Sequence, residues 1–180
     1  INIKTSKYVG MDIQRTGIDE IDFDQIFKQW YGAIRNFVYY KIGDVTKAED
    51  IAQDTFLKLW EKRDTIKTET VKSLLYTIAN NLTINVIEHN NVTFKFENKY
   101  KPDTKHPSPE YDMEMKEFDQ RLQQVLGQLD EKQRTVFLMN RIDEMTYNEI
   151  AQSLGLTVKA IEKRMEKALS YLRKNIAVKI

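Results

Sequence analysis

Residues 146–161 read TYNEIAQSLGLTVKAI and decide the fold of the second half of the chain. Thr146 and Glu149 have the spacing of a capping box, which predicts the start of a helix. Gly155 stands where that helix must stop and turn sharply, because glycine adopts a left-handed backbone at little cost. Thr157 then suits the N-cap of a following helix. The stretch therefore predicts a helix-turn-helix.

The second helix of this motif carries a basic outer face. Residues 157–175 hold six Lys or Arg against two Glu, a local charge of +4 on a chain whose formal net charge is +1. A recognition helix contacts bases with its N-terminal residues and phosphates from its flanks. An ordinary amphipathic helix with a solvated basic face stays open as the alternative. The candidate DNA contacts are Thr157, Lys159, Ala160, Lys163, Arg164 and Lys167.

Helical periodicity also runs through the first half of the chain. Between residues 23 and 38 apolar side chains recur at three- and four-residue steps, which predicts one buried helical face. Thr46 and Glu49 form another capping box, so we expect a second helix to start there and to end near Arg63. A third helix is expected from about Thr70.

The prolines indicate where the two halves are joined. All three fall between residues 91 and 112, in a polar stretch without sustained periodicity, which predicts a linker. We therefore expect an all-α fold of two small helical domains joined by a flexible linker, the second containing the helix-turn-helix. The first domain is predicted over residues 22–90 and the second over 113–180, after an N-terminal tail, 1–21, that could be disordered.

The composition excludes several kinds of site. Without any cysteine, the chain has no disulfide, thiolate metal site or thiol nucleophile, and we expect it in the cytoplasm. No apolar run approaches the roughly 20 residues that span a bilayer, so we expect no membrane insertion. His89 and His106 lack metal-ligand spacing, and no phosphate-binding glycine loop occurs. We expect no catalytic residue, metal, cofactor or small-molecule substrate.

The outward stripe of the second predicted helix has the composition of a protein interface. Leu57 and Trp60 are large apolar side chains within a polar and acidic rim, the anatomy of an interface hot spot. The alternative is that Trp60 folds over the edge of its own domain. The predicted binding residues are Asp50, Gln53, Asp54, Leu57, Trp60 and Glu61.

Both halves resemble one family. Residues 46–60, TKAEDIAQDTFLKLW, resemble region two of extracytoplasmic-function (ECF) sigma factors, the segment that grips the clamp helices of core RNA polymerase. Residues 129–134, LDEKQR, with the helix-turn-helix resemble region four, which reads the minus-35 promoter element. The resemblance covers about residues 22–178. It implies a cytoplasmic initiation factor that binds core RNA polymerase and promoter DNA and is often held inactive by an anti-sigma factor.

The third predicted helix both matches this family and departs from it. Residues 74–82, LLYTIANNL, match the promoter-melting region, which implies Tyr76, Asn80 and Asn81 as base contacts at the minus-10 element. The family usually carries Arg or Lys around residues 88–91, where this chain has a Glu, and lost phosphate contacts weaken DNA binding. A candidate compensation is a stacking platform for single-stranded bases in the linker, made of Phe94, Lys95, Phe96, Lys99, Tyr100 and Lys101.

Other classes of protein are weighed against this resemblance. An enzyme would need a concave, desolvated site around its acid–base groups, for which the sequence offers no signal. A response regulator would need alternating strands and helices, and residues 22–90 show no strand-like alternation. A sigma-like adaptor or helix-turn-helix regulator that does not open promoters stays open, because the basic residues after the third helix are missing.

Overall fold

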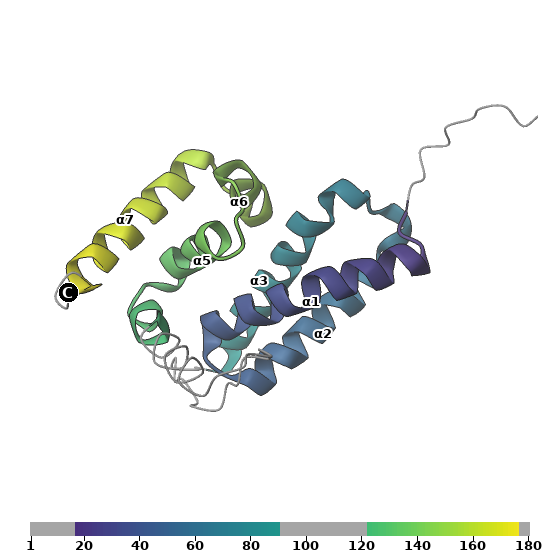
Figure 1. The fold of residues 1–180 in the computed structure, drawn as a ribbon, viewed down its shortest axis with the longest axis horizontal. Helices are drawn as coiled ribbons and strands as arrows, with labels where there is room; N and C mark the ends of the chain where they lie inside the picture. Colours follow the sequence, from purple (N-terminus) through teal and green to yellow (C-terminus); the bar gives the residue numbers. More distant parts are fainter. Residues whose placement is uncertain (1–16, 91–121, 177–180) are drawn as a thin grey trace, which may run out of the picture.

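The computed structural model describes residues 17–90 and 122–176, and every regular element in these ranges is a helix (Figure 1). The prediction of an all-α fold is confirmed. The predicted linker, with its candidate stacking platform, and residues 1–16 of the predicted tail lie outside the described residues. Residues 122–127 are helical as well and precede α5. The elements are α1 (Glu20–Ile42), α2 (Val45–Glu61), the 3₁₀ turns η1 (Arg63–Thr65) and η2 (Thr68–Thr70), α3 (Val71–Asn90), α5 (Glu131–Arg141), α6 (Tyr147–Leu154) and α7 (Val158–Ile176).

The start of α2 differs from the prediction. The side chain of Asp44 accepts a hydrogen bond from the amide of Lys47 at 3.0 Å and caps the helix. The predicted start at Thr46 was therefore wrong, because an aspartate two residues earlier satisfies the first free amides. The helix ends at Glu61, and Arg63 already belongs to a 3₁₀ turn.

α1, α2 and α3 form the first helical group, with α1 packed against both of the others. Their apolar faces meet in a core in which side chains such as Val38, Leu59 and Leu75 have no exposed surface. The predicted buried face of α1 is confirmed in its C-terminal half. In the N-terminal half Phe27 departs from the prediction, because 37% of its surface is exposed.

α5, α6 and α7 form the second helical group and contain the helix-turn-helix. The Thr146–Glu149 capping box is present at the start of α6, with the Thr146 amide donating to Glu149 Oε2 at 2.7 Å. Gly155 has φ of +63° and ends the helix in the left-handed conformation. Thr157 Oγ1 accepts from the Ala160 amide at 3.3 Å at the start of α7. The predicted motif and both of its caps are confirmed.

The two helical groups pack against each other. Figure 1 shows α5 and α6 beside the first group, and contacts join α1 to α5 and α3 to α6. The buried apolar residues of both groups form one continuous cluster. Among the described residues, no helix is both long enough and apolar enough to cross a bilayer.

Candidate nucleic-acid and protein interfaces

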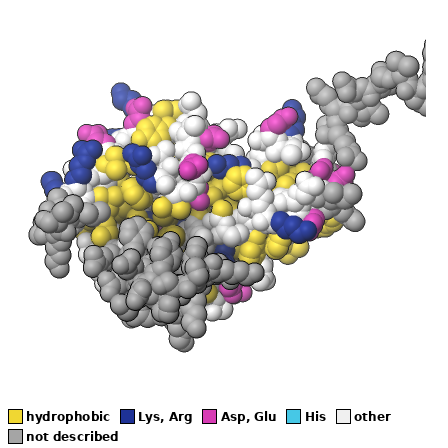
Figure 2. All heavy atoms as spheres, viewed as in Figure 1, with side chains coloured by type: hydrophobic (Ala, Val, Ile, Leu, Met, Phe, Trp, Pro, Cys, Tyr) yellow, Lys and Arg dark blue, Asp and Glu magenta, His cyan; other side chains and the backbone are white. Residues whose placement is uncertain are grey.

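The outer face of α7 is basic and open. Lys159, Lys163 and Lys167 are exposed, whereas Arg164 is half-buried, and the structure records no ion pair for any of them within its described ranges. Figure 2 shows Lys and Arg side chains along the edge of the molecule that α7 forms. Cationic side chains without acidic partners remain available to phosphate oxygens. The predicted DNA contacts of the helix-turn-helix therefore lie on one outward face.

The other face of α7 fixes the position of this surface. Ile161, Met165 and Ala168 are at most 1% exposed and pack into the second group. The turn before α7 is held by a hydrogen bond from the Leu156 amide to the Ala151 carbonyl at 2.9 Å. Because α6 and the turn are tied together, Thr157 and the first residues of α7, such as Ala160, are held on a rigid support.

The predicted binding residues of α2 lie on one outward face, named here the α2 surface: Asp50, Gln53, Asp54, Leu57, Trp60 and Glu61. All of them except Trp60 are exposed, and 55% of the surface of Leu57 is accessible. Trp60 is half-buried. Its ring meets Phe23 edge-on with 4.8 Å between ring centroids, and the Arg63 guanidinium lies 4.3 Å from its centroid. Trp60 thus packs against its own domain and still contributes to the outward face.

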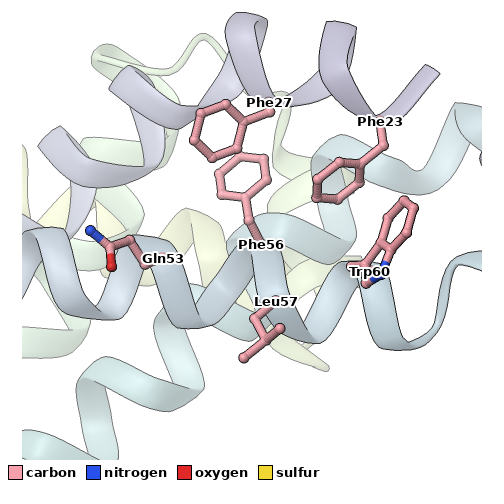
Figure 3. A pocket seen from close by; sticks show the side chains of 6 residues that line it. All are labelled: Phe23, Phe27, Gln53, Phe56, Leu57 and Trp60. Atoms are coloured by element: carbon pink, nitrogen blue, oxygen red, sulfur yellow. The ribbon is translucent and has the colours of Figure 1, made fainter. Parts of the chain in front are cut away.

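An apolar groove adjoins the α2 surface between α1 and α2 (Figure 3). Phe23 and Phe27 line it from α1, and Phe56, Gln53, Leu57 and Trp60 line it from α2. Sequence reasoning assigned the three phenylalanines to the buried core and missed the groove. The available signal was the four-residue step from Phe23 through Phe27 to Tyr31, an aromatic row beside the main apolar stripe. Phe27 and Tyr31 stack with 4.8 Å between centroids.

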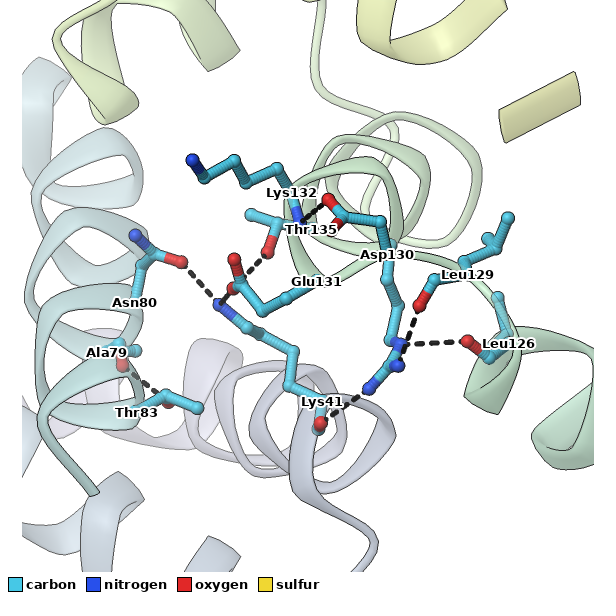
Figure 4. A network of polar contacts seen from close by, with 11 residues as sticks. Lys41, Ala79, Asn80, Thr83, Leu126, Leu129, Asp130, Glu131, Lys132 and Thr135 are labelled. Atoms are coloured by element: carbon cyan, nitrogen blue, oxygen red, sulfur yellow. Dashed lines mark hydrogen bonds and ion pairs between the residues drawn. The ribbon is translucent and has the colours of Figure 1, made fainter. Parts of the chain in front are cut away.

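The three candidate minus-10 contacts of α3 do not share an exposed surface. Tyr76 is fully buried and Asn80 is 6% exposed, whereas Asn81 is exposed. Asn80 Oδ1 accepts from Lys41 Nζ (Figure 4), and the Tyr76 ring packs edge-on against Phe37. The expectation that all three lie on the polar side of α3 is wrong for Tyr76 and Asn80, because both pack against α1 and the Tyr76 hydroxyl also faces Asp143 of the second helical group.

Tyr76 also faces a buried carboxyl group across the contact between the groups. Burial raises the pKa of Asp143 to about 7, although the Tyr76 hydroxyl and the charge of Lys72 oppose the rise. Burial and the nearby Asp143 charge raise the pKa of Tyr76. The Tyr76 hydroxyl and Asp143 Oδ2 have no well-aligned hydrogen bond within the described residues. This carboxyl group is therefore sensitive to whether the two groups are packed together.

No arrangement suited to a metal ion is found in residues 17–90 and 122–176, where no three His, Cys, Asp or Glu side chains lie together as a ligand set. His89 and Glu88 are exposed near the end of α3. The described surfaces are the open basic face of α7 and an apolar groove that adjoins the α2 surface. Together they define a DNA-binding protein of the helix-turn-helix class with a separate surface for a protein partner.

Two family models match the two helical groups in chain order. "Sigma-70 region 2" matches residues 26–92 and "Sigma-70, region 4" matches residues 119–172. The chain belongs to the sigma-70 family of RNA polymerase sigma factors and is of the ECF type. It is thus a sigma factor that directs promoter-specific transcription initiation, and sigma factors are initiation factors that bind core RNA polymerase and promoter DNA.

Sigma factors from other bacteria are similar to this chain over most of its length. The ferric citrate uptake sigma factor FecI of Escherichia coli (strain K12) is 28% identical over 163 residues, which cover 89% of this chain and 94% of FecI. RNA polymerase sigma factor YlaC of Bacillus subtilis (strain 168) is 26% identical over 85% of this chain and 91% of its own length. ECF sigma factor SigW of the same organism is 28% identical over 88% of this chain and 90% of its own.

Solved structures show the same fold. CnrH in complex with the cytosolic domain of CnrY matches with a TM-score of 0.68 and 22% identity, covering 90% of this chain and 92% of CnrH. The sigma factor RpoE in complex with the anti-sigma factor NepR from Bartonella quintana matches with a TM-score of 0.65 and 24% identity, covering 88% of this chain and 99% of that one.

Proposed function

We propose that this sigma factor binds core RNA polymerase through the α2 surface and the adjoining groove. The observation that carries the proposal is the exposed Leu57 next to the half-buried Trp60, where both line an apolar groove on the helix that also exposes Asp50 and Asp54. A few hot-spot residues, among which Trp is enriched, contribute most of the binding energy of a protein interface, and the contacts around them exclude water. The acidic residues Asp50 and Asp54 favour a basic partner surface.

The α7 face is proposed to read the minus-35 element. Lys159, Ala160, Lys163 and Arg164 lie within the first two turns of the helix, where a recognition helix reaches base edges. Arg164 is suited to a bidentate contact with a guanine edge, and Lys167 to a phosphate. The rigid support under α7 favours sequence-specific contacts over a loose electrostatic one.

The minus-10 element is proposed to bind α3 through Tyr76, Asn80 and Asn81. Of these only Asn81 is accessible in the present conformation, so Tyr76 and Asn80 must be released from their contacts with α1 before they can reach DNA. The exposed Glu88 near the end of α3 favours a second candidate, a sigma-like adaptor that binds core polymerase but does not open promoters. Negative charge at that position opposes contact with phosphate.

Run-off transcription separates these two candidates. The full chain is added to purified core RNA polymerase on fragmented genomic DNA, and the 5′ ends of the transcripts are sequenced. A promoter-opening factor yields defined start sites that share upstream and downstream elements. An adaptor co-purifies with core polymerase and yields none, and a chain that does neither contradicts the proposed function.

The remaining partners and the location follow from the same function. We propose that the factor acts in the cytoplasm, supplies no catalytic group of its own, and is regulated by an anti-sigma factor. RpoE, which shares the fold, was solved in complex with the anti-sigma factor NepR. Co-purification of the tagged chain from its native cells, followed by identification of the bound proteins, tests for such a partner.

A further inference from the structure

The apolar groove between α1 and α2 leaves large side chains accessible on both of its walls. Phe27 of α1 and Leu57 of α2 are exposed, and both line the groove (Figure 3). The Phe27 ring meets Phe56 edge-on with 5.0 Å between ring centroids, so the aromatic walls support each other. Apolar patches of this kind mark sites that bind another segment of protein.

The helix face beside the groove is acidic. Between residues 50 and 61 the exposed side of α2 carries Asp50, Asp54 and Glu61 against Lys58. No ion pair involves any of these four side chains within the ranges 17–90 and 122–176. A segment that combines apolar side chains with positive charge is therefore complementary to the groove and its surroundings.

The described part of the chain starts at the Trp60 end of this groove. The Ile18 amide donates to the Arg63 carbonyl at 2.9 Å, and the Ile18 side chain is buried. The Arg63 guanidinium in turn lies 4.3 Å from the centroid of the Trp60 ring, which lines the groove. Residues 1–16, named here the N-terminal segment, are therefore joined to the molecule beside the groove.

The sequence of the N-terminal segment has the chemistry that the groove requires. The segment carries three Lys or Arg against a single Asp, a charge opposite to that of the α2 face. Its residues 9–14 read VGMDIQ, in which Val9, Met11 and Ile13 alternate with Gly and polar residues. An extended chain with this alternation has one apolar side.

The lengths of the segment and of the groove also agree. Trp60 and Gln53, which line the groove from α2, are seven residues apart, or roughly 10 Å along a helix. Residues 9–13 cover about 13 Å when extended, and Ile13 lies at most about 18 Å from Ile18. A tether this short gives a local concentration of roughly millimolar order. The segment is thereby favoured over a second copy of the chain in dilute solution.

We propose that the N-terminal segment binds this groove in the free factor and competes there with core RNA polymerase. Val9, Met11 and Ile13 lie against the aromatic walls, and the basic residues of the segment lie over the acidic face of α2. The inference rests on the proposed function, because it takes the groove as part of the polymerase-binding surface. A groove that is covered in about nine molecules of ten has its apparent affinity for core polymerase lowered about tenfold.

A photo-reactive label locates the segment in the free, full-length protein. Because the native chain has no cysteine, Met11→Cys introduces the only thiol, to which a benzophenone maleimide is attached. Irradiation is expected to give cross-links within one chain to residues 23–27 and 53–60, which contain the groove. Ile3→Cys, labelled in the same way outside the alternating stretch, is the matched control. Cross-links between two chains would assign the groove to a second copy and overturn the proposal, as would a Met11→Cys map no richer in groove residues than that of Ile3→Cys.

The affinity for core polymerase measures the competition. The full-length triple variant Val9→Ser, Met11→Ser and Ile13→Ser is expected to bind core polymerase about tenfold more tightly than the wild type, because its segment no longer covers the groove. Ile1→Ser with Ile3→Ser also removes apolar side chains from the segment and should bind like the wild type. Equal affinities of the wild type and the triple variant would overturn the competition.

The two measurements keep this inference separate from the proposed function. If neither the wild type nor the triple variant binds core polymerase, the proposed function fails, and the cross-link map alone decides whether the segment covers the groove. If both bind core polymerase equally and the map shows no preference for the groove, the inference fails and the proposed function stands.

Discussion

The α2 surface and the covered side of α3 belong to the same helical group but have opposite chemistry. The α2 surface is apolar at its centre and open, with Leu57 55% exposed. The covered side of α3 is polar, with the hydroxyl groups of Ser73 and Thr77 bonded to Ser153 of the second group. An open apolar surface is suited to a partner that binds tightly, whereas a polar contact is suited to one that is exchanged. The difference indicates that the α2 surface is open to a partner in this structure, whereas the bonded side of α3 is not.

The largest expected effect is the loss of the open surface. Leu57→Ala with Trp60→Ala removes both apolar anchors, and two hot-spot residues together contribute on the order of 4 kcal/mol or more to binding. Core polymerase should no longer be retained by the tagged double variant, while its thermal unfolding stays cooperative. Ile142→Ala, which removes an exposed apolar side chain from the second helical group, serves as the matched control. Undiminished retention of core polymerase by the double variant would refute the assignment.

The next effect is the pH dependence of the contact between the two helical groups. While the two helical groups are packed together, burial raises the pKa of Asp143 from 3.8 to about 7, and Tyr76 and Lys72 of α3 face its carboxyl group. The carboxyl group binds its proton more tightly when the two helical groups are packed together than when they are separated. Protonation therefore stabilises the packing at low pH, and this contribution is lost as the pH rises from about 4 to about 7. The shift corresponds to at most about 4 kcal/mol between pH 4 and 7.

Intramolecular energy transfer measures this packing. Dyes are attached at Glu69→Cys and Glu166→Cys, two exposed positions on η2 and α7. Transfer efficiency should change between pH 5 and pH 8 in the labelled chain and should become insensitive to pH in that range when Asp143→Asn is added. Glu131 should not contribute to this response, because its pKa is lowered and it stays ionised over this pH range. Burial raises the pKa of Glu131, but the charge of Lys41 and its hydrogen bond lower it by more. A persistent pH response in the Asp143→Asn chain would assign the effect to another group.

A smaller loss of binding free energy is expected when a side chain that contacts the minus-35 element is removed. Arg164→Ala is expected to cost about 1 to 3 kcal/mol on a matched element, the energy of a lost bidentate base contact. The comparison is with Arg173→Ala near the end of α7, which should weaken binding to all sequences about equally and lower the salt dependence. Fluorescence anisotropy on matched and scrambled upstream duplexes gives both quantities. Equal losses on the two duplexes would assign Arg164 to phosphate.

Local sequence signals made the helix-turn-helix of the second helical group predictable. Contacts between residues far apart in the sequence could not be predicted. The Thr146–Glu149 box, Gly155 and Thr157 act within a few residues, so their spacing alone defined the helix-turn-helix. Asp44, which sequence reasoning did not consider as a cap, caps α2 in place of Thr46. Tyr76 and Asn80 could not be placed, because their environment comes from residues far along the chain.

The smallest expected effect concerns how Trp60 is held at the edge of the open surface. The Arg63 guanidinium lies 4.3 Å from the centre of the Trp60 ring, and its Nη1 donates to the Trp60 carbonyl at 3.0 Å. Arg63→Ala should weaken core binding by about 0.5 to 1 kcal/mol, the energy of an exposed cation–π contact, and Arg63→Lys should restore part of it. Lys62→Ala, at the exposed neighbouring position, is the matched control for lost charge. Because the indole would sample more orientations without the guanidinium above it, the tryptophan emission should shift in Arg63→Ala and not in Lys62→Ala. If the two variants bind core polymerase equally, Arg63 contributes only its charge, and the groove with Phe23 is sufficient to position Trp60.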